Sequence, residues 1–474
     1  MNISPQPPLT RGAGVLLPIS SLPSPYGIGA FGREAFEFID FLKAAGQKYW
    51  QILPLSQTGF GDSPYQSFSA FAGNPYFIDL DVLVNRGLLS RTECAAVGFG
   101  ENPEQADYGA LWRSRYDLLR RAYARSGYKD SPEDKRLVRE QEWLFDFCLF
   151  MALKSRFSYV SWLTWPDAFR FREPDALEKA GKELAGEMDF RRFCQFHFFS
   201  QWRELKAYAN QNGIQIIGDI PLYVSPDSAD LWTDPGLFQL DDNLQPTRVA
   251  GVPPDNFSET GQLWGNPLYN WDAMEQDGFA WWKRRMAASA ELYDIIRIDH
   301  FIGIVNYYSI PAGDKTAENG VWVDGPGEKL LAAVSEVMGG SRIIAEDLGK
   351  VTKQVTDLRE KFGYPGMRLL QTDFESAIVK NCVVYGGTHD NETLAGFFKE
   401  RPELPDSLIR KGYASGADLV VFQMQDYLGL GNQARTNTPS TVGGNWQWRL
   451  TKDRLTGELA GKLKQLAETN GRST

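Results

Sequence analysis

Carboxylate side chains follow directly on several short apolar runs of the sequence. They are Asp219, Asp299, Glu346 and Asp390. Arg297 lies two residues before Asp299, and alternate residues of an extended strand share one face. Retaining glycosidases use one ionised and one protonated carboxyl group, about 5 Å apart, around an oxocarbenium-like transition state. One chemistry that the pattern permits is therefore cleavage of a glycosidic bond with retention of configuration.

Under this interpretation, each group has a distinct task. Arg297 would keep a nucleophilic Asp299 ionised by charge pairing, and burial or a neighbouring carboxylate would raise the pKa of Glu346 for acid and base duty. Two alternatives remain open at this point. Asp219, Asp299 and Glu346 end three successive apolar runs, and three carboxylates could hold Mg²⁺. The carboxylates could also be rim residues that cap helices or form ion pairs.

The elements that must position these residues are eight short apolar runs, many of them followed by a helix-like stretch. Nearly continuous apolar runs are typical of strands buried on both faces of a parallel sheet. The runs are residues 14–19, 48–55, 214–220, 294–299, 342–346, 367–371, 382–385 and 419–422. Eight strand–helix units predict an α/β fold, a (β/α)₈ TIM barrel, whose active site lies at the carboxyl ends of the strands. A doubly wound sheet is the alternative, because periodicity does not show closure.

Two intervals between the runs are too long for simple crossovers. Residues 84–210 are charged and helix-patterned in their middle, which predicts a mainly helical insertion. Residues 225–275 are rich in Pro, Gly, Asn, Asp and Trp, which predicts a substrate-loop subdomain over the active-site end. The barrel is then predicted to consist of three segments. Residues 1–83 contain its first strands and helices, residues 211–224 contain the third strand, and residues 276–474 contain the remaining strands and a terminal helix.

Composition restricts the class of protein. The 474 residues carry a formal net charge of −10, whereas a general nucleic-acid binder is normally basic. The four cysteines show no CxxC spacing, which favours buried free thiols in a reducing compartment. Neither a signal peptide nor a stretch of about 20 apolar residues is visible, so we expect a cytoplasmic protein without a membrane segment. Several of the 14 tryptophans lie in loop-like stretches, where an indole could stack on a flat ligand face.

Three short segments carry a family resemblance. Residues 297–301 (RIDHF), 345–349 (AEDLG) and 387–391 (GTHDN) resemble the catalytic segments of the amylomaltases. These enzymes are the 4-α-glucanotransferases, or disproportionating enzymes, of the α-amylase clan. Seven further segments resemble the substrate loops of that family: residues 20–29, 62–66, 72–76, 251–255, 261–267, 425–431 and 437–439. The helical insertion is not matched by any motif.

The resemblance implies roles for individual residues. Asp299 would be the nucleophile, Glu346 the general acid/base, and Asp390 a stabiliser of the transition state through the sugar hydroxyls. Arg297 and His389 would support the donor sugar. The glucan-binding residues that the resemblance implies are Tyr65, Asp219, Gln262 and Trp264. The family uses no metal and no organic cofactor, which argues against the Mg²⁺ alternative.

The activity implied by the resemblance is transfer of α-1,4-glucan segments from a donor to an acceptor glucan or glucose. It would run as a retaining double displacement through a covalent glycosyl–Asp intermediate, with α-1,4-glucans and maltooligosaccharides as substrates. An α-glucan hydrolase is the first rival, since it shares the acid pair. A non-catalytic glucan-binding barrel is the second, and the presence of all three carboxylates argues against it. The sequence indicates no protein partner.

The sequence departs from relatives at two places. Val224 stands where α-amylases carry a histidine, which is normal for amylomaltases and separates this chain from amylases. After Gln371, the family usually shows a Pro/Asn-rich loop with an acidic binding residue, whereas residues 372–377 of this chain run quickly into Lys380. This loop is predicted to be shortened, and no site residue is assigned to it.

Overall fold

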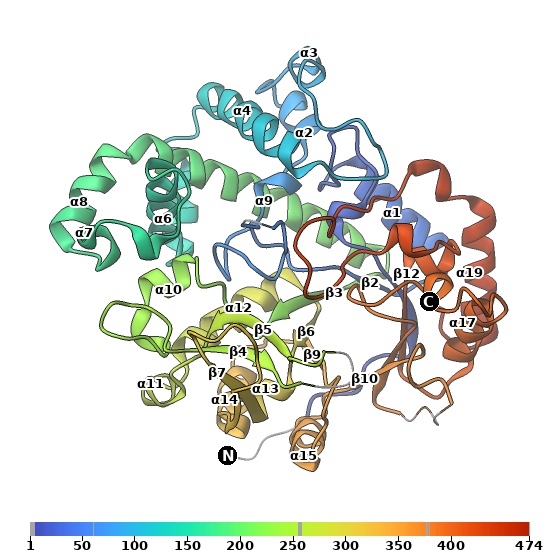
Figure 1. The fold of residues 1–474 in the computed structure, drawn as a ribbon. Helices are drawn as coiled ribbons and strands as arrows, with labels where there is room; N and C mark the ends of the chain where they lie inside the picture. The colour runs from blue at the N-terminus through green and yellow to red at the C-terminus, as the bar shows by residue number, and fades with distance from the viewer. Residues whose placement is uncertain (1–4, 60, 255–257, 376–377, 379, 474) are drawn as a thin grey trace.

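The eight apolar runs form eight parallel strands in a computed structural model, which describes residues 5–59, 61–254, 258–375, 378 and 380–473 (Figure 1). The strands are β1 (Gly12–Leu16), β2 (Tyr49–Gln51), β3 (Gln215–Pro221), β6 (Ile295–Asp299), β9 (Arg342–Ala345), β10 (Gly366–Leu369), β11 (Cys382–Tyr385) and β12 (Leu419–Gln423). Their order in the sheet is β10-β11-β12-β1-β2-β3-β6-β9. Because β1 pairs with β12, the sheet curls into a barrel. The predicted (β/α)₈ barrel is confirmed, and the doubly wound alternative is excluded.

The barrel interior is filled by side chains that alternate along the strands. The buried cluster comprises Leu9, Leu16, Tyr49, Ile217, Ile295, Ile344, Met367, Leu369, Val383, Tyr385, Leu419 and Val421. The other face of each strand packs against helices, so both faces of the sheet leave water, as the continuous apolar runs predict. Towards the carboxyl ends of the strands the interior side chains are polar. There the Tyr385 hydroxyl donates a hydrogen bond to Gln51 Oε1 at 2.7 Å.

Helices surround the barrel. They include α1 (Arg33–Ala44), α12 (Ala280–Leu292), α14 (Gly327–Ser335), α15 (Lys353–Lys361), α17 (Leu404–Ala414) and α19 (Gly457–Thr469). In α1, Ala35, Phe38, Ile39 and Leu42 follow the spacing of one helical face, and all four are buried. No helix in the described part of the chain is both long and apolar enough to cross a bilayer.

A group of helices between β2 and β3 projects from one side of the barrel (Figure 1). It includes α4 (Tyr108–Ser126), α5 (Pro132–Glu140), α6 (Leu144–Arg156), α8 (Pro174–Glu183) and α9 (Ala185–Gln211). The long helix α9 packs against α4, α5, α6 and α8, and it also contacts α1 and β3 of the barrel. Phe198 and Trp202 of α9 both contact Phe31 near α1. One continuous helix therefore joins these helices to the barrel wall.

A second sheet combines two strands from the segment between β3 and β6 with two strands that follow β6. Its strands are β4 (Arg248–Val252), β5 (Gln262–Pro267), β7 (Asn306–Pro311) and β8 (Val321–Asp324), in the antiparallel order β5-β4-β7-β8. Residues 306–324 lie outside the predicted substrate-loop region, and their pairing with it was not expected from the sequence. At Gly251 a Cβ atom would lie 2.2 Å from the Gln262 carbonyl oxygen, so only glycine allows this approach of β4 and β5. Asp255 of the resembling motif and residues 376–377 of the shortened loop lie outside the described residues.

Candidate active site

A buried ion cluster lies at the carboxyl ends of β3 and β6. The register of these strands pairs Asp219 with Arg297. Asp299 lies two residues after Arg297 in β6, on the same face of the strand. Arg297 Nη1 donates hydrogen bonds to Asp219 Oδ1 and Oδ2 at 2.7 and 2.6 Å, and to Asp299 Oδ1 at 3.0 Å. Arg297 is 2% exposed and Asp219 is fully buried. One guanidinium nitrogen thus bridges two carboxylates and offsets part of the repulsion between them.

Glu346 follows β9 and faces the same cluster. Its Oε2 accepts the backbone N–H of His300 at 2.7 Å, and its Oε1 accepts that of Leu348 at 3.0 Å. His300 presents this donor from the left-handed region, with φ of 55°, a conformation that costs a non-glycine residue about 1 to 3 kcal/mol. Such strain is typical of functional sites, because the surrounding structure must hold it in place.

The environments of the two carboxyl groups separate their pKa values. Burial raises the pKa of Glu346 to about 8, and the nearby charge of Asp299 adds to this, against the opposing effects of Arg297 and two backbone donors. Burial also raises the pKa of Asp299, to about 6, while Arg297 opposes the shift. Between these values Asp299 is ionised and Glu346 carries a proton. A pair of carboxyl groups with separated pKa values is the arrangement that assigns one acid and one nucleophile.

Asp390 follows β11 and is held by residues from the chain's later loops. Asn437 Nδ2 donates to Asp390 Oδ1 at 2.6 Å, and Arg435 donates to the Asp390 carbonyl at 2.7 Å. His389 Nε2 lies 3.2 Å from Asp390 Oδ2. Burial opposes ionisation of Asp390, but His389 and Asn437 outweigh it and lower its pKa to about 2. Asp390 is therefore a fixed negative charge.

Tyr65 joins this group to the ion cluster. Its hydroxyl donates to Asp219 Oδ2 at 2.9 Å, and its ring stacks on His389 with centroids 5.1 Å apart and an interplanar angle of 16°. The ring of Trp446 lies 5.9 Å from that of Tyr65. Six of the nine predicted site residues thus form one connected set: Tyr65, Asp219, Arg297, Asp299, His389 and Asp390.

The other predicted binding residues flank the site from the small sheet. Trp264 Nε1 donates to Gln262 Oε1 at 3.1 Å. The indole meets the His300 ring edge to face at 4.8 Å, and the backbone of His300 holds Glu346. Gln262 and Trp264 therefore approach the site from the side of Glu346, whereas Tyr65 approaches from that of Asp390.

Sequence reasoning missed three residues that support the site. Asn437 occurs in a family-like motif but received no role. Trp446 was one of the loop tryptophans that could stack on a ligand but was assigned to no site, and Arg435 carried no signal beyond its residue type. All three lie between β12 and the last helix and reach Asp390 or His389 only through the fold.

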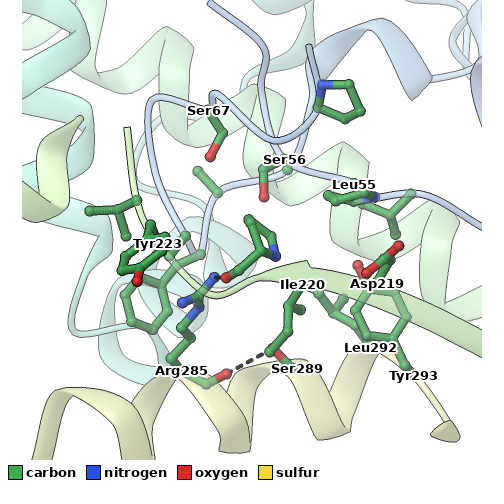
Figure 2. Close-up of a pocket in the computed structure, with 18 of the residues that line it drawn as sticks. Leu55, Ser56, Ser67, Asp219, Ile220, Tyr223, Arg285, Ser289, Leu292 and Tyr293 are labelled. Atoms are coloured by element: carbon green, nitrogen blue, oxygen red, sulfur yellow. Dashed lines mark hydrogen bonds between the residues drawn. The ribbon is translucent and has the colours of Figure 1, made fainter. Parts of the chain in front are cut away.

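The end of β3 is fixed from behind by a buried cation. Arg285 of α12 donates to the carbonyls of Pro221 and Leu222, directly after Asp219 in the chain. Figure 2 shows the cavity between these residues, with Asp219 at one end and Arg285 and Tyr223 at the other. The Ser289 hydroxyl donates to the Arg285 carbonyl at 2.9 Å, the dashed contact in that view. This wall holds Asp219 in place from outside the barrel.

The donor set does not favour the magnesium alternative. Asp219 and Asp299 direct oxygen atoms at Arg297, so a protein cation occupies the position between them. Within the described ranges, no group of three or more His, Cys, Asp or Glu side chains is placed to hold a metal ion. The rim-residue alternative is met in its ion-pair form, since Asp219 and Asp299 share Arg297 and Asp390 lies beside His389, and these pairs lie together at one end of the barrel.

Comparison with known proteins gives a consistent result. The sequence profile of a family described as 4-alpha-glucanotransferase matches residues 17–456. A 4-alpha-glucanotransferase of Clostridium butyricum is 47% identical, and the match covers 96% of this chain and 99% of the relative. A 4-alpha-glucanotransferase of Thermus thermophilus is 45% identical, and the match covers 98% of this chain and 99% of the relative. The solved structure of an amylomaltase from Streptococcus agalactiae in complex with acarbose superposes with a TM-score of 0.94, at 40% identity over 98% of this chain and all of that one.

Proposed function

Since the chain belongs to the 4-alpha-glucanotransferase family, we propose that Asp299, Glu346 and Asp390 carry out its transfer of α-1,4-glucan segments by a retaining double displacement. The observation that supports this assignment best is the contrast between the surroundings of two carboxyl groups, since Asp299 contacts a cation and Glu346 is buried against backbone donors. Arg297 stabilises ionised Asp299, while burial keeps a proton on Glu346. A nucleophile and an acid are the two groups that this reaction needs.

The first displacement forms the glycosyl–enzyme intermediate. An Asp299 oxygen attacks the anomeric carbon of the donor glucan, and the bond to the glycosidic oxygen breaks as Glu346 transfers its proton to that oxygen. The departing sugar leaves with a free hydroxyl, and Glu346 becomes a carboxylate. Asp390, fixed by Asn437 and next to His389, supplies negative charge beside the oxocarbenium-like transition state.

The second displacement resolves the intermediate. Glu346, now ionised, takes the proton from a hydroxyl of the acceptor sugar, whose oxygen attacks the anomeric carbon and releases Asp299. Configuration is retained because the carbon is inverted twice. We assign donor binding to Tyr65 and His389, which form one stacked face, and acceptor binding to Gln262 and Trp264, which reach the site from the Glu346 side.

The proposed compartment is the cytoplasm. The four cysteines are buried thiols, as expected where thiols stay reduced. The similar amylomaltase structure from Streptococcus agalactiae is a complex with acarbose, and we propose that this chain also binds a sugar ligand.

The product pattern from maltotriose tests the transferase assignment. Each bond that is broken is replaced by one that is made, so the concentration of reducing ends is expected to stay nearly constant. Chromatography should show glucose together with a ladder of maltooligosaccharides longer than maltotriose. A steady rise in reducing ends without longer products would contradict transfer and favour hydrolysis.

Replacing Trp264 should weaken transfer relative to hydrolysis. Water competes with the acceptor for the glycosyl intermediate, so transfer needs an acceptor that is held and oriented. Loss of an aromatic stacking partner costs about 0.5 to 1.5 kcal/mol, so we expect the transfer-to-hydrolysis ratio of Trp264→Ala to fall roughly threefold to tenfold. The ratio of longer products to new reducing ends measures this.

Trp322→Ala is the matched control, because Trp322 is a 39% exposed indole of β8 in the same small sheet. It should keep the wild-type ratio. An equal transfer-to-hydrolysis ratio in Trp264→Ala and Trp322→Ala would contradict the assignment of Trp264 to acceptor binding.

A further inference from the structure

The strand that precedes Glu346 lies at a seam of the barrel. β9 and β10 are the two ends of the hydrogen-bonded strand order, and no ladder joins them. One backbone bond, from Ala345 N–H to the Pro365 carbonyl at 3.0 Å, crosses the gap. β9 therefore has a full ladder with β6 on one side only, and the end of β9 needs another constraint to hold Glu346 in position.

Asp347 supplies a second bond across this seam. Its Oδ1 accepts the backbone N–H of Met367 in β10 at 2.8 Å, and its Oδ2 lies 3.3 Å from Arg359 Nε. The side chain is buried, with 4% of the residue exposed. A Cβ atom at Gly366 would lie 2.3 Å from Asp347 Oδ2, so the glycine makes room for the carboxylate. The carboxylate takes the place of a missing ladder bond.

Arg359 extends this contact to the helix behind the seam. It belongs to α15, and its Nη1 donates to the Tyr364 carbonyl at 3.0 Å, just before β10 begins. The Asp347 carboxylate is thus bound on one side by a strand and on the other by a cation that is itself attached to the loop entering that strand.

Glu346 and Asp347 are neighbours, and successive side chains of an extended chain point to opposite sides. Glu346 contacts the backbone of His300 beside the ion cluster, while Asp347 contacts β10 in the seam. Fixing Asp347 therefore fixes the backbone from which the Glu346 side chain departs. We infer that Asp347 is a positioning residue that aims Glu346 at the glycosidic oxygen by closing the barrel seam. This inference rests on the proposed role of Glu346.

A purely structural role would give a different result, and Asp294 is the matched control for it. Asp294 Oδ2 accepts the backbone N–H of Ile216 in β3 at 2.7 Å, the same kind of carboxylate-to-strand bond, but at the opposite end of the barrel. Its ion pair with Lys206, at 3.7 Å, parallels that of Asp347 with Arg359. Loss of either carboxylate costs stability, but only loss of Asp347 affects Glu346.

The experiment compares two donors in Asp347→Ala, Asp347→Asn, Asp294→Ala and Glu346→Gln. Maltotriose needs a proton on its leaving group, whereas an α-glucosyl fluoride does not. A displacement of about 1 Å in a catalytic group costs on the order of 100-fold. We expect Asp347→Ala to lose about 100-fold in kcat on maltotriose and less than about threefold in the rate of the first-turnover burst of fluoride, which precedes the step that needs Glu346 as a base, with Asp347→Asn between it and the wild type. The alkaline limb of the maltotriose pH profile should shift in the Asp347 variants and stay in Asp294→Ala.

Each outcome distinguishes the claims. An equal loss on both donors in Asp347→Ala, with donor discrimination in Glu346→Gln, would overturn the positioning role and leave the proposed function intact. An equal loss on both donors in Glu346→Gln would overturn the acid assignment itself. If Asp347→Ala does not fold, the ratio of activity on maltotriose to activity on the fluoride is measured in Asp347→Asn and Arg359→Gln instead. A wild-type ratio and a wild-type pH profile in both variants would refute the inference.

Discussion

Asp299→Asn is expected to reduce turnover of maltotriose by a factor of about 10⁴ or more while the protein stays folded. An amide nitrogen or oxygen cannot form the glycosyl ester, so no intermediate is made. The barrel should tolerate the change, because burial disfavours the ionised form of Asp299 and raises its pKa above the usual value. A neutral amide removes that penalty, and the thermal midpoint should be equal to or above that of the wild type at neutral pH.

Mass spectrometry of a trapped intermediate checks this directly. With a glycosyl fluoride donor, a rapidly quenched wild-type sample should carry one sugar on the peptide that contains Asp299, and Asp299→Asn should carry none. Asp294→Asn, the same substitution at the far end of the barrel, should retain both the label and the activity. A folded Asp299→Asn with normal turnover, or a label on another carboxylate, would remove Asp299 from its role.

Glu346→Gln should lose about 10²- to 10⁴-fold on maltooligosaccharides, the range that a general acid contributes. The first step on a glycosyl fluoride should survive, since fluoride leaves without a proton. The structure adds a complication: both carboxylate oxygens of Glu346 accept backbone N–H groups, from His300 and Leu348. A glutamine offers only one acceptor oxygen, so a thermal melt must accompany the kinetics to separate lost chemistry from lost packing.

The pH profile gives an independent measurement of the same group. In the wild type, activity should fall on the acid side as Asp299 gains a proton, near its pKa of about 6, and on the alkaline side as Glu346 loses one, near about 8. With the fluoride donor, the first step should lack the alkaline limb in the wild type and in Glu346→Gln alike, and the acid limb should remain in both. Persistence of both limbs would assign the alkaline one to another residue.

Much of the barrel could be predicted because its strands are buried on both faces. A strand such as β12 is a continuous apolar run for that reason, and acidic residues mark the carboxyl ends of four other runs, namely Asp219, Asp299, Glu346 and Asp390. The small sheet could not be predicted, since β5 and β8 are partly exposed and the sheet depends on the pairing of β4 with β7, which lie on either side of β6 in the sequence. The segment boundaries at residues 83, 210, 224 and 275 remain predictions.

The proposed catalytic carboxylates could be identified from the sequence because a family-like motif lies at the end of a predicted strand at Asp299 and at Glu346. The residues that hold them could not. Asn437 and Asp390 are 47 positions apart in the chain, and Asp347 reaches Met367 across a seam whose position depends on strand order. Residue type and spacing do not encode such contacts, which exist only once the sheet has closed.

The pairing of β1 with β12 has a consequence for biosynthesis. Gly12–Leu16 leaves the ribosome about 400 residues before its partner Leu419–Gln423, which at roughly 5 to 20 residues per second is a delay of about 20 to 80 s. During that interval one edge of the nascent sheet has no partner strand, and unpaired edges are where chains aggregate. β2 and β3 can pair with each other once α9 has been made, so the nascent chain is expected to accumulate as an open, helix-covered half-barrel. The active site, whose parts come from both halves, is assembled only in the last phase of translation.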